Sequence, residues 1–169
     1  MESAPSIFAL FDAARMGPWM EQAKELHPDN TSLYKGRSEA VLAPFAPHLF
    51  PFAAETALSR WFFTHGWGQD WGVFCGSSAS ASDLLRHFRR FLKVGLEDGQ
   101  PFYFRFYDPR VLRVFLPTCN AQQLQLFFGP VDYFWVEDED PAYGLYYMLE
   151  QDALLSYRVL RLELEETFS

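Results

Sequence analysis

A chain of 169 residues has the size of one domain, and a composition that is 49% apolar and 18% aromatic excludes a disordered protein. The net charge of −8 is uneven: residues 1–131 carry 12 basic and 12 acidic side chains, whereas residues 132–169 carry 2 basic and 10 acidic ones. This polarity suits oriented docking to another protein. It argues against a general nucleic-acid binder, whose whole domain is usually basic.

The first third of the chain is predicted to alternate strands with helices. Residues 6–12 are short and almost entirely apolar, as buried strands are, and a helix runs from Pro18 to about residue 26. Residues 32–34 are expected to form a second short strand. Residues 41–52 contain three prolines, which forbid a regular helix and interrupt a strand ladder, so this segment is predicted as an extended connection packed against the core.

Residues 54–64 have a helical composition that ends before Gly66, and residues 71–75 are predicted as the next strand. The helix that follows is the clearest in the sequence, with Ser80 or Ser82 as its N-cap. Its side chains separate onto two opposite faces. The apolar face consists of Leu84, Leu85, Phe88, Phe91 and Leu92. The basic face consists of Arg86, Arg89, Arg90 and Lys93.

The pattern in residues 102–107 alternates strictly and predicts a strand. One predicted face carries Phe102, Phe104 and Phe106, and the other carries Tyr103, Arg105 and Tyr107. Asp108 as N-cap and Pro109 as first residue then open a helix that Pro117 ends. Asn120 caps a further short helix, and residues 131–136 are predicted as a strand.

The acidic C-terminal region, residues 137–169, is predicted to close the fold with a pair of strands at residues 143–149 and 154–165. Alternation of Leu160, Leu162 and Leu164 with charged residues supports the second strand, and a helix is the alternative there. Strands interleaved with helices indicate the α/β class. We therefore expect a single layered domain, residues 1–169, with a mixed β-sheet flanked by helices and the C-terminal strand pair at an edge.

Residues that could carry chemistry are sparse. No phosphate-binding loop, dinucleotide fingerprint or nucleophile elbow occurs in the sequence, and no metal site or cofactor is predicted. Cys75 and Cys119 are expected to be buried free thiols, and His87 a hydrogen-bonded structural residue. A hydrolase that pairs Cys75 with His87 is kept as an alternative. With no signal peptide pattern and no apolar run of roughly 20 residues, the protein is expected to be cytoplasmic, without membrane insertion.

Two features allow both a structural and a functional interpretation. Seven basic side chains fall between Arg86 and Arg113, either as a solvated surface or as a docking surface for a polar partner segment. Single-stranded nucleic acid is an alternative partner for this patch and its aromatic neighbours. Arg105 lies in an aromatic segment and needs a carboxylate if it is buried, so an ion-pair corner with Asp108, beside Arg110, is its expected role. Direct partner contact is the alternative for Arg105.

A series of motifs carries a family resemblance. In chain order they occupy residues 32–36, 46–49, 71–74, 85–92, 104–112 and 127–131. The fifth contains FRFYDPR, residues 104–110, which is the most specific of them. From about residue 7 to residue 136, the sequence resembles the adaptor/chaperone domain family of type VI secretion, long catalogued only as a domain of unknown function.

The resemblance implies a non-catalytic protein that binds a cognate toxic effector in the cytoplasm and helps to load it onto the VgrG-type spike protein, which carries valine-glycine repeats. It implies no catalytic residues, no cofactor and no nucleic-acid partner. The candidate partner-binding residues are Arg86, Arg89, Arg90, Lys93, Tyr103, Arg105, Tyr107 and Arg110. The candidate structural residues of the motifs are His87, Asp108 and Pro109.

Overall fold

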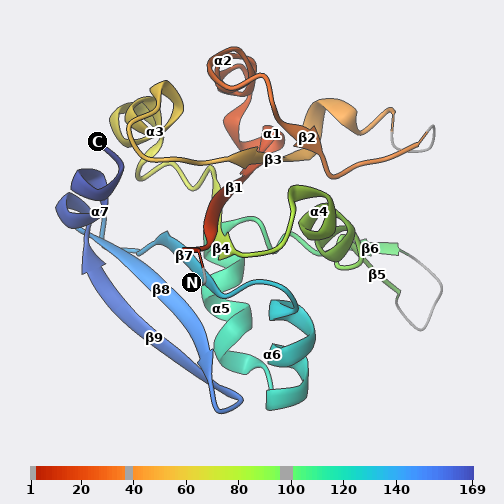
Figure 1. Ribbon diagram of the computed structural model, residues 1–169. Helices are drawn as coiled ribbons and strands as arrows, with labels where there is room; N and C mark the ends of the chain where they lie inside the picture. Colours follow the sequence, from red (N-terminus) through yellow and green to blue (C-terminus); the bar gives the residue numbers. More distant parts are fainter. Residues whose placement is uncertain (1–2, 37–39, 96–100) are drawn as a thin grey trace.

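The computed structural model describes residues 3–36, 40–95 and 101–169, in which a seven-stranded sheet lies between two layers of helices (Figure 1). The strand order across the sheet is β2-β3-β1-β4-β7-β8-β9. The strands are β1 (Ser6–Asp12), β2 (Thr31–Ser32), β3 (Pro47–Pro51), β4 (Gly72–Ser77), β7 (Tyr133–Glu137), β8 (Tyr143–Glu150) and β9 (Ala153–Leu160). A separate two-stranded sheet consists of β5 (Lys93–Gly95) and β6 (Pro101–Tyr103).

Helices cover both faces of the large sheet. One face is covered by α1 (Ala13–Met16), α2 (Trp19–Leu26), α3 (Ala57–Trp61) with its π-helical continuation η3 (Phe62–Gly66), and α7 (Arg161–Phe168). The other face is covered by α4 (Ala81–Arg89), α5 (Pro109–Thr118) and α6 (Ala121–Phe128). A short 3₁₀ turn, η2 (Ala43–Phe45), precedes β3. In the part of the chain described, no helix is long and apolar enough to cross a membrane.

The central strands are apolar on both faces because each face has its own core. In β1, Phe8 and Leu10 pack toward the core beneath α4, α5 and α6, whereas Ala9 and Phe11 pack toward the core beneath α1, α2, α3 and α7. A strand covered on both sides reads as a continuous apolar run, as predicted for residues 6–12. The α/β class, the layered architecture and the edge position of the C-terminal strand pair are confirmed.

All pairings among the described strands of the large sheet are antiparallel. The sheet still contains strands that run in the same direction. β3 and β4 are one such pair, but β1 lies between them and pairs with both. Strands of equal direction are therefore separated by an opposed neighbour, and the parallel pairs that a mixed sheet would contain do not form.

The prediction of an extended connection at residues 41–52 is wrong for its second half. Residues 47–51 form β3, an interior strand that pairs with β1 on one side and β2 on the other. Pro47 and Pro51 lie at its two ends, opposite Asp12 and Phe8. The prolines therefore bound the strand instead of interrupting it, since the three residues between them keep their N–H donors.

The predicted strand at residues 102–107 is also wrong in its second half. β6 ends at Tyr103, and the chain turns before α5, where the Asp108 N–H donates to the Arg105 carbonyl at 3.0 Å. Phe106 and Tyr107 are consecutive in this turn, and both are buried. Strand alternation would have placed these two rings on opposite faces.

The predicted strand at residues 154–165 ends earlier than expected. β9 stops at Leu160, and residues 161–168 form α7. Leu164 and Phe168, four residues apart, lie on one face of this helix and are buried in the core with Phe52 and Trp135. The ring of Phe168 lies 5.1 Å from that of Phe52 and 5.6 Å from that of Trp135. This distant aromatic core decides between strand and helix at a place where the local alternation misleads.

Substitution of two leucines in α7 tests this arrangement. Leu164→Ala removes a buried side chain and should lower the free energy of unfolding by about 2–4 kcal/mol. Leu162→Ala, the same change at a side chain that is 68% exposed, should alter it by less than about 0.5 kcal/mol. Denaturant unfolding measures both. Equal losses would contradict the helix, because a strand places both leucines on one face.

Candidate functional site

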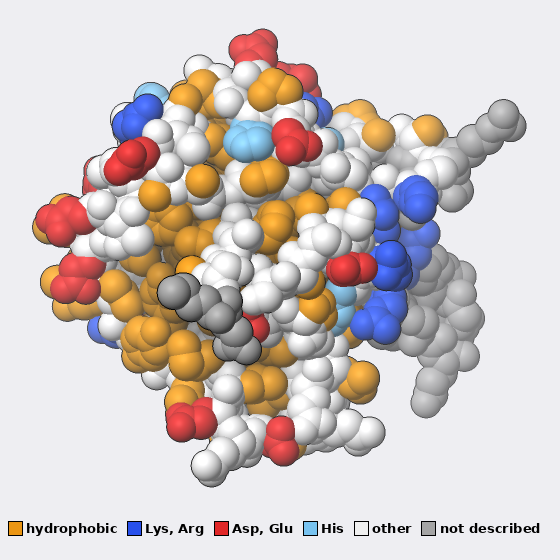
Figure 2. Space-filling view, viewed as in Figure 1, with side chains coloured by type: hydrophobic (Ala, Val, Ile, Leu, Met, Phe, Trp, Pro, Cys, Tyr) orange, Lys and Arg blue, Asp and Glu red, His pale blue; other side chains and the backbone are white. Residues whose placement is uncertain are grey.

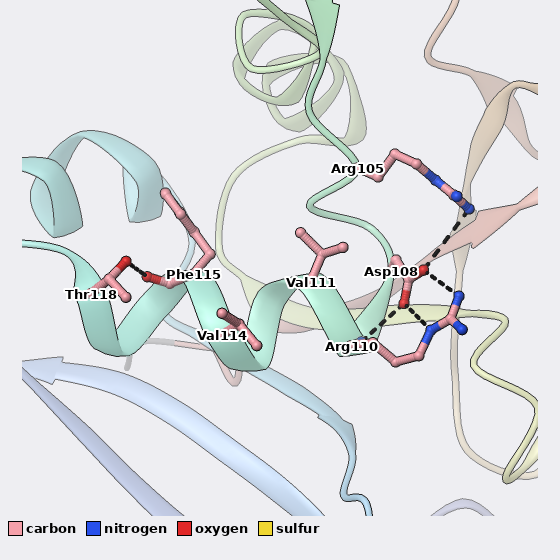
Figure 3. Close-up of a pocket in the computed structure, with 7 residues that line it drawn as sticks. All are labelled: Arg105, Asp108, Arg110, Val111, Val114, Phe115 and Thr118. Atoms are coloured by element: carbon pink, nitrogen blue, oxygen red, sulfur yellow. Dashed lines mark hydrogen bonds and ion pairs between the residues drawn. The ribbon is translucent and has the colours of Figure 1, made fainter.

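The junction between residue 105 and α5 is organised around the carboxylate of Asp108. Asp108 is the N-cap of α5, and its Oδ1 accepts the Arg110 backbone N–H at 2.9 Å, with Pro109 as the first helical residue. The Arg110 side chain returns to the same carboxylate and donates from Nε at 3.1 Å and from Nη2 at 2.8 Å. Figure 3 shows the side chains of Arg105 and Arg110 converging on Asp108 from two directions. The predicted cap is confirmed.

Arg105 joins this carboxylate to a second, buried one. Its Nη2 lies 3.9 Å from Oδ2 of Asp108 and forms a short hydrogen bond to Asp12, whose side chain is 1% exposed. Asp12 is the last residue of β1 and caps α1 by accepting the Ala14 N–H at 3.0 Å. The predicted pairing of Arg105 with Asp108 is present. The contact with Asp12, 93 residues away, was missed, although an acidic residue at the end of an apolar strand is a recognisable N-cap signal.

A third carboxylate, that of Asp70, extends the cluster. Its Oδ2 lies 3.8 Å from Nε of Arg110 and 3.7 Å from Nη2 of Arg15. We call these six residues the Arg–Asp network. The network consists of Asp12, Asp70, Asp108, Arg15, Arg105 and Arg110. It connects the end of β1, helix α1, the loop before β4 and the start of α5.

Glu137, at the end of β7, holds the loop that presents Asp70. Its buried carboxylate accepts the Gly68 N–H at 2.6 Å and the Asp70 N–H at 3.0 Å. These bonds stabilise Asp70 in left-handed backbone, with φ of 56°. Burial raises the pKa of Glu137 to about 7, although both N–H donors and the charge of Arg113 oppose the rise. The sequence assigned Glu137 only to an acidic turn, since nothing local indicates a partner almost 70 residues away.

Beside the network, an open groove of about 750 Å³ follows the exposed side of α5 (Figure 3). The groove is lined by Arg105, Asp108, Arg110, Val111, Val114, Phe115 and Thr118. Val114 is 70% exposed, and the charged network closes one end of an otherwise apolar surface. The groove therefore offers apolar contact next to two half-exposed guanidinium groups.

The basic residues of the other motif divide into two kinds. Arg86 and Arg90 are exposed on α4, and Arg86 is ion-paired with Asp83 at 3.0 Å. Arg89 instead donates to the Leu33 carbonyl at 3.0 Å and to the Ser32 carbonyl at 2.9 Å, so it joins α4 to the chain beside β2.

Lys93 does not lie on the basic face of α4, as the sequence predicts. The helix ends at Arg89, and Lys93 begins β5, where its ammonium lies 5.8 Å from the centroid of the Tyr103 ring. Tyr103 is exposed. The two residues therefore extend the basic surface of α4 onto the small sheet.

Two further motif residues are buried. His87 Nε2 lies 2.7 Å from the Phe127 carbonyl oxygen, and Nδ1 lies 3.0 Å from Nη2 of Arg90, so the predicted structural hydrogen bond is present. Burial lowers the pKa of His87, against the effect of the Phe127 carbonyl. Tyr107 is 4% exposed and shares a hydrogen bond with Tyr34, and burial raises its pKa. A partner can therefore reach neither side chain without a rearrangement.

The two cysteines differ in exposure and are both free thiols. Cys75 is fully buried in β4, which raises its thiol pKa, and Cys119 is half-buried with Sγ 3.4 Å from the Phe115 carbonyl oxygen. Both ring nitrogens of His87 contact groups other than Cys75. Within the described ranges, no group of three or more His, Cys, Asp or Glu side chains could hold a metal ion.

The fold and the site define a three-layer α/β domain with an ion-paired strand-to-helix junction beside an exposed basic and apolar surface. Residues 7–126 match the model of the family described as Domain of unknown function (DUF4123), and the chain belongs to this family. All six residues of the Arg–Asp network lie inside the matched range, whereas the motif at residues 127–131 lies beyond it. No curated protein and no solved structure matches the chain.

Removal of one charge tests whether Asp108 stabilises the junction. Asp108→Asn should lower the free energy of unfolding at pH 7 by about 2 kcal/mol, because buried arginine partners lose their carboxylate. Asp29→Asn, at an exposed aspartate, should change it by less than about 0.5 kcal/mol. Denaturant unfolding across pH provides the measurement.

The pH dependence of the Asp108 effect has a defined sign. Burial disfavours ionisation, but hydrogen bonds from Arg110 and the charge of Arg105 hold the pKa of Asp108 below its ordinary value of 3.8. Its stabilisation is present above pH 3.8 and is lost as the pH falls through the lowered pKa. The difference between wild type and Asp108→Asn should therefore shrink in acid. A difference that grows in acid would contradict the ion pairing.

Glu137 predicts the opposite pH dependence. A carboxyl whose pKa rises from 4.5 to about 7 on folding binds its proton more tightly in the folded state, so its contribution to stability declines as the pH rises through this window. The stability difference between wild type and Glu137→Gln should fall by up to about 3 kcal/mol between these pH values. Urea unfolding at closely spaced pH values measures it. A difference that stays constant would show that burial does not perturb this carboxyl.

Proposed function

We propose that this protein is a non-catalytic adaptor that binds a toxic effector protein in the cytoplasm and helps to load it onto the VgrG-type spike of a type VI secretion apparatus. The motif series at residues 32–131, with its FRFYDPR segment, and membership of the DUF4123 family support this assignment. One structural observation carries it: the exposed basic surface formed by α4 and the small sheet.

This basic surface is accessible on one side of the molecule. Figure 2 shows Lys and Arg side chains gathered over α4 and the neighbouring strands, while acidic side chains predominate on the opposite side. Its accessible members are Arg86, Arg90, Lys93 and Tyr103. A cluster of exposed guanidinium and ammonium groups next to an aromatic ring suits an acidic or polar partner segment, and it would orient the partner during docking.

The contacts of the other motif residues support a division between fold and binding. Arg89 and Tyr107 are engaged with the main chain near β2 and with Tyr34, and Arg105 and Arg110 are paired with aspartates. Their first role is to hold α4 and α5 in position. The exposed arginines of α4 are the better candidates for client contact.

The positions of Cys75 and His87 favour an adaptor over a hydrolase. A nucleophile needs a thiol that ionises and a base within hydrogen-bonding reach. Burial raises the pKa of the Cys75 thiol, and the His87 ring contacts the Phe127 carbonyl and Arg90. Neither residue has the environment that hydrolysis would require.

Charge reversal on α4 tests the proposal. The double variant Arg86→Glu/Arg90→Glu should keep the fold, because neither side chain is buried, and should lose co-purification with the effector and spike encoded beside the gene. Arg60→Glu, at an exposed arginine of α3, is the charge-matched control and should retain the complex. Pull-down after co-expression, with circular dichroism of each variant, provides the readout.

Two results would overturn the proposal. One is the absence of any complex between the wild-type chain and the neighbouring effector or spike. The other is a complex that both the double variant and the control retain equally, which would place the client elsewhere. Unfolding of the double variant is resolved by testing Arg86→Glu alone, since the Arg86 side chain is 76% exposed.

A further inference from the structure

The outer edge of β9 is an open sheet edge. β9 is the last strand in the order and pairs with β8 through eight residues. In the part of the chain that the structure describes, no other strand or backbone group bonds to residues 153–160 along this edge. The unpaired N–H and C=O groups of an edge strand are a ready template for another extended chain.

Side chains of β9 do not protect this edge in the usual ways. The strand contains no proline, and Leu155, Tyr157 and Leu160 are 39%, 48% and 44% exposed. Its one charged residue, Arg158, is paired with Asp138 at 2.5 Å, and its guanidinium lies 4.4 Å from the centroid of the Tyr143 ring. Edge strands are usually blocked by proline or by outward charges, so a long apolar edge indicates a contact surface.

A row of tyrosines leads across the sheet to this edge. Tyr133 on β7 lies 5.6 Å from Tyr146 on β8, and Tyr146 stacks on Tyr157 of β9 at 5.3 Å with an angle of 4° between the rings. A groove of about 450 Å³ follows the row. Its lining is completed by Met148, Val159, Glu163, Leu164 and Thr167. The groove combines aromatic faces with one carboxylate.

The charge of the surrounding chain restricts the occupant. Residues 132–169 carry 10 acidic and 2 basic side chains, and Glu163 lines the groove itself. Figure 2 shows apolar side chains gathered over the β8–β9 hairpin with acidic ones around them. Two copies joined edge to edge would bring these acidic regions together, so like charge disfavours a second copy. Lysine or arginine side chains, in contrast, would contact both the tyrosine faces and Glu163.

We infer that β9 accepts an extended, basic segment of a partner protein as an additional strand, with lysine or arginine side chains of that segment in the tyrosine groove. Backbone hydrogen bonds supply the affinity, and the groove selects the charge. This surface lies apart from the basic face of α4 (Figure 2), and the inference does not depend on the proposed function.

A peptide of defined pattern tests the inference with the full chain. The probe is a fluorescent peptide of about ten residues in which Lys alternates with Val and Thr, and its control carries Glu in place of each Lys. Fluorescence anisotropy should show at least about tenfold tighter binding of the Lys peptide. Hydrogen exchange should show slower exchange of amides in residues 153–160 when this peptide is bound, which simple charge attraction would not produce.

Matched variants locate the binding. Leu155→Lys and, separately, Tyr157→Lys place a positive charge on the edge and should weaken binding of the Lys peptide by at least about tenfold. Leu162→Lys makes the same charge change at an exposed leucine of α7, outside the strand, and should weaken it by less than about threefold. Thermal unfolding of each variant checks that the hairpin remains intact, and Leu155→Lys leaves the tyrosine stack untouched.

Four outcomes would overturn the inference. They are no binding of the Lys peptide, equal binding of the Glu peptide, unchanged exchange of the β9 amides, and equal weakening by Leu162→Lys. A dimer in analytical ultracentrifugation that Tyr157→Lys dissociates would also overturn it, because a second copy would then occupy the edge.

Discussion

The burial of two aspartate carboxylates, Asp12 and Asp108, is the constraint on which the rest of this structure depends. A buried carboxylate is costly unless cations and N–H donors surround it. Arg105 and Arg110 supply the cations, and the first turns of α1 and α5 supply the donors. The end of β1 and the start of α5 must therefore meet, although 93 residues separate Asp12 from Arg105. Helices on both faces of the sheet take their positions from this meeting point.

This constraint separates the most specific motif from the surface that we propose binds a partner. Most polar side chains of the FRFYDPR segment face aspartates or other chain segments, which explains why these residue types occur there without a catalytic role. The exposed groups lie next to the network, on α4 and along the α5 groove. Substitutions in the network would change binding indirectly, through the position of these helices, and substitutions at exposed arginines would change it directly.

The two proposed surfaces differ in chemistry and in location. The basic face of α4 suits an acidic partner segment, whereas the edge at β9 is apolar, aromatic and surrounded by acidic residues. A protein with both could hold two partners of opposite character at once, as an adaptor must. The uneven charge of the sequence then has a physical purpose, because each partner is repelled from the other's site.

Local chemistry determined much of this protein from the sequence alone. N-caps such as Ser80, Asp108 and Asn120, and the apolar run of β1, act through neighbours within a few residues, so the pattern suffices to predict them. Tertiary structure alone decided the rest. β3 forms between its two prolines because β1 and β2 flank it, and residues 161–168 become a helix because an aromatic core accepts Leu164 and Phe168. The roles of Asp12, Asp70 and Glu137 depend on partners more than 60 residues away, and such long-range pairing leaves no local pattern to read.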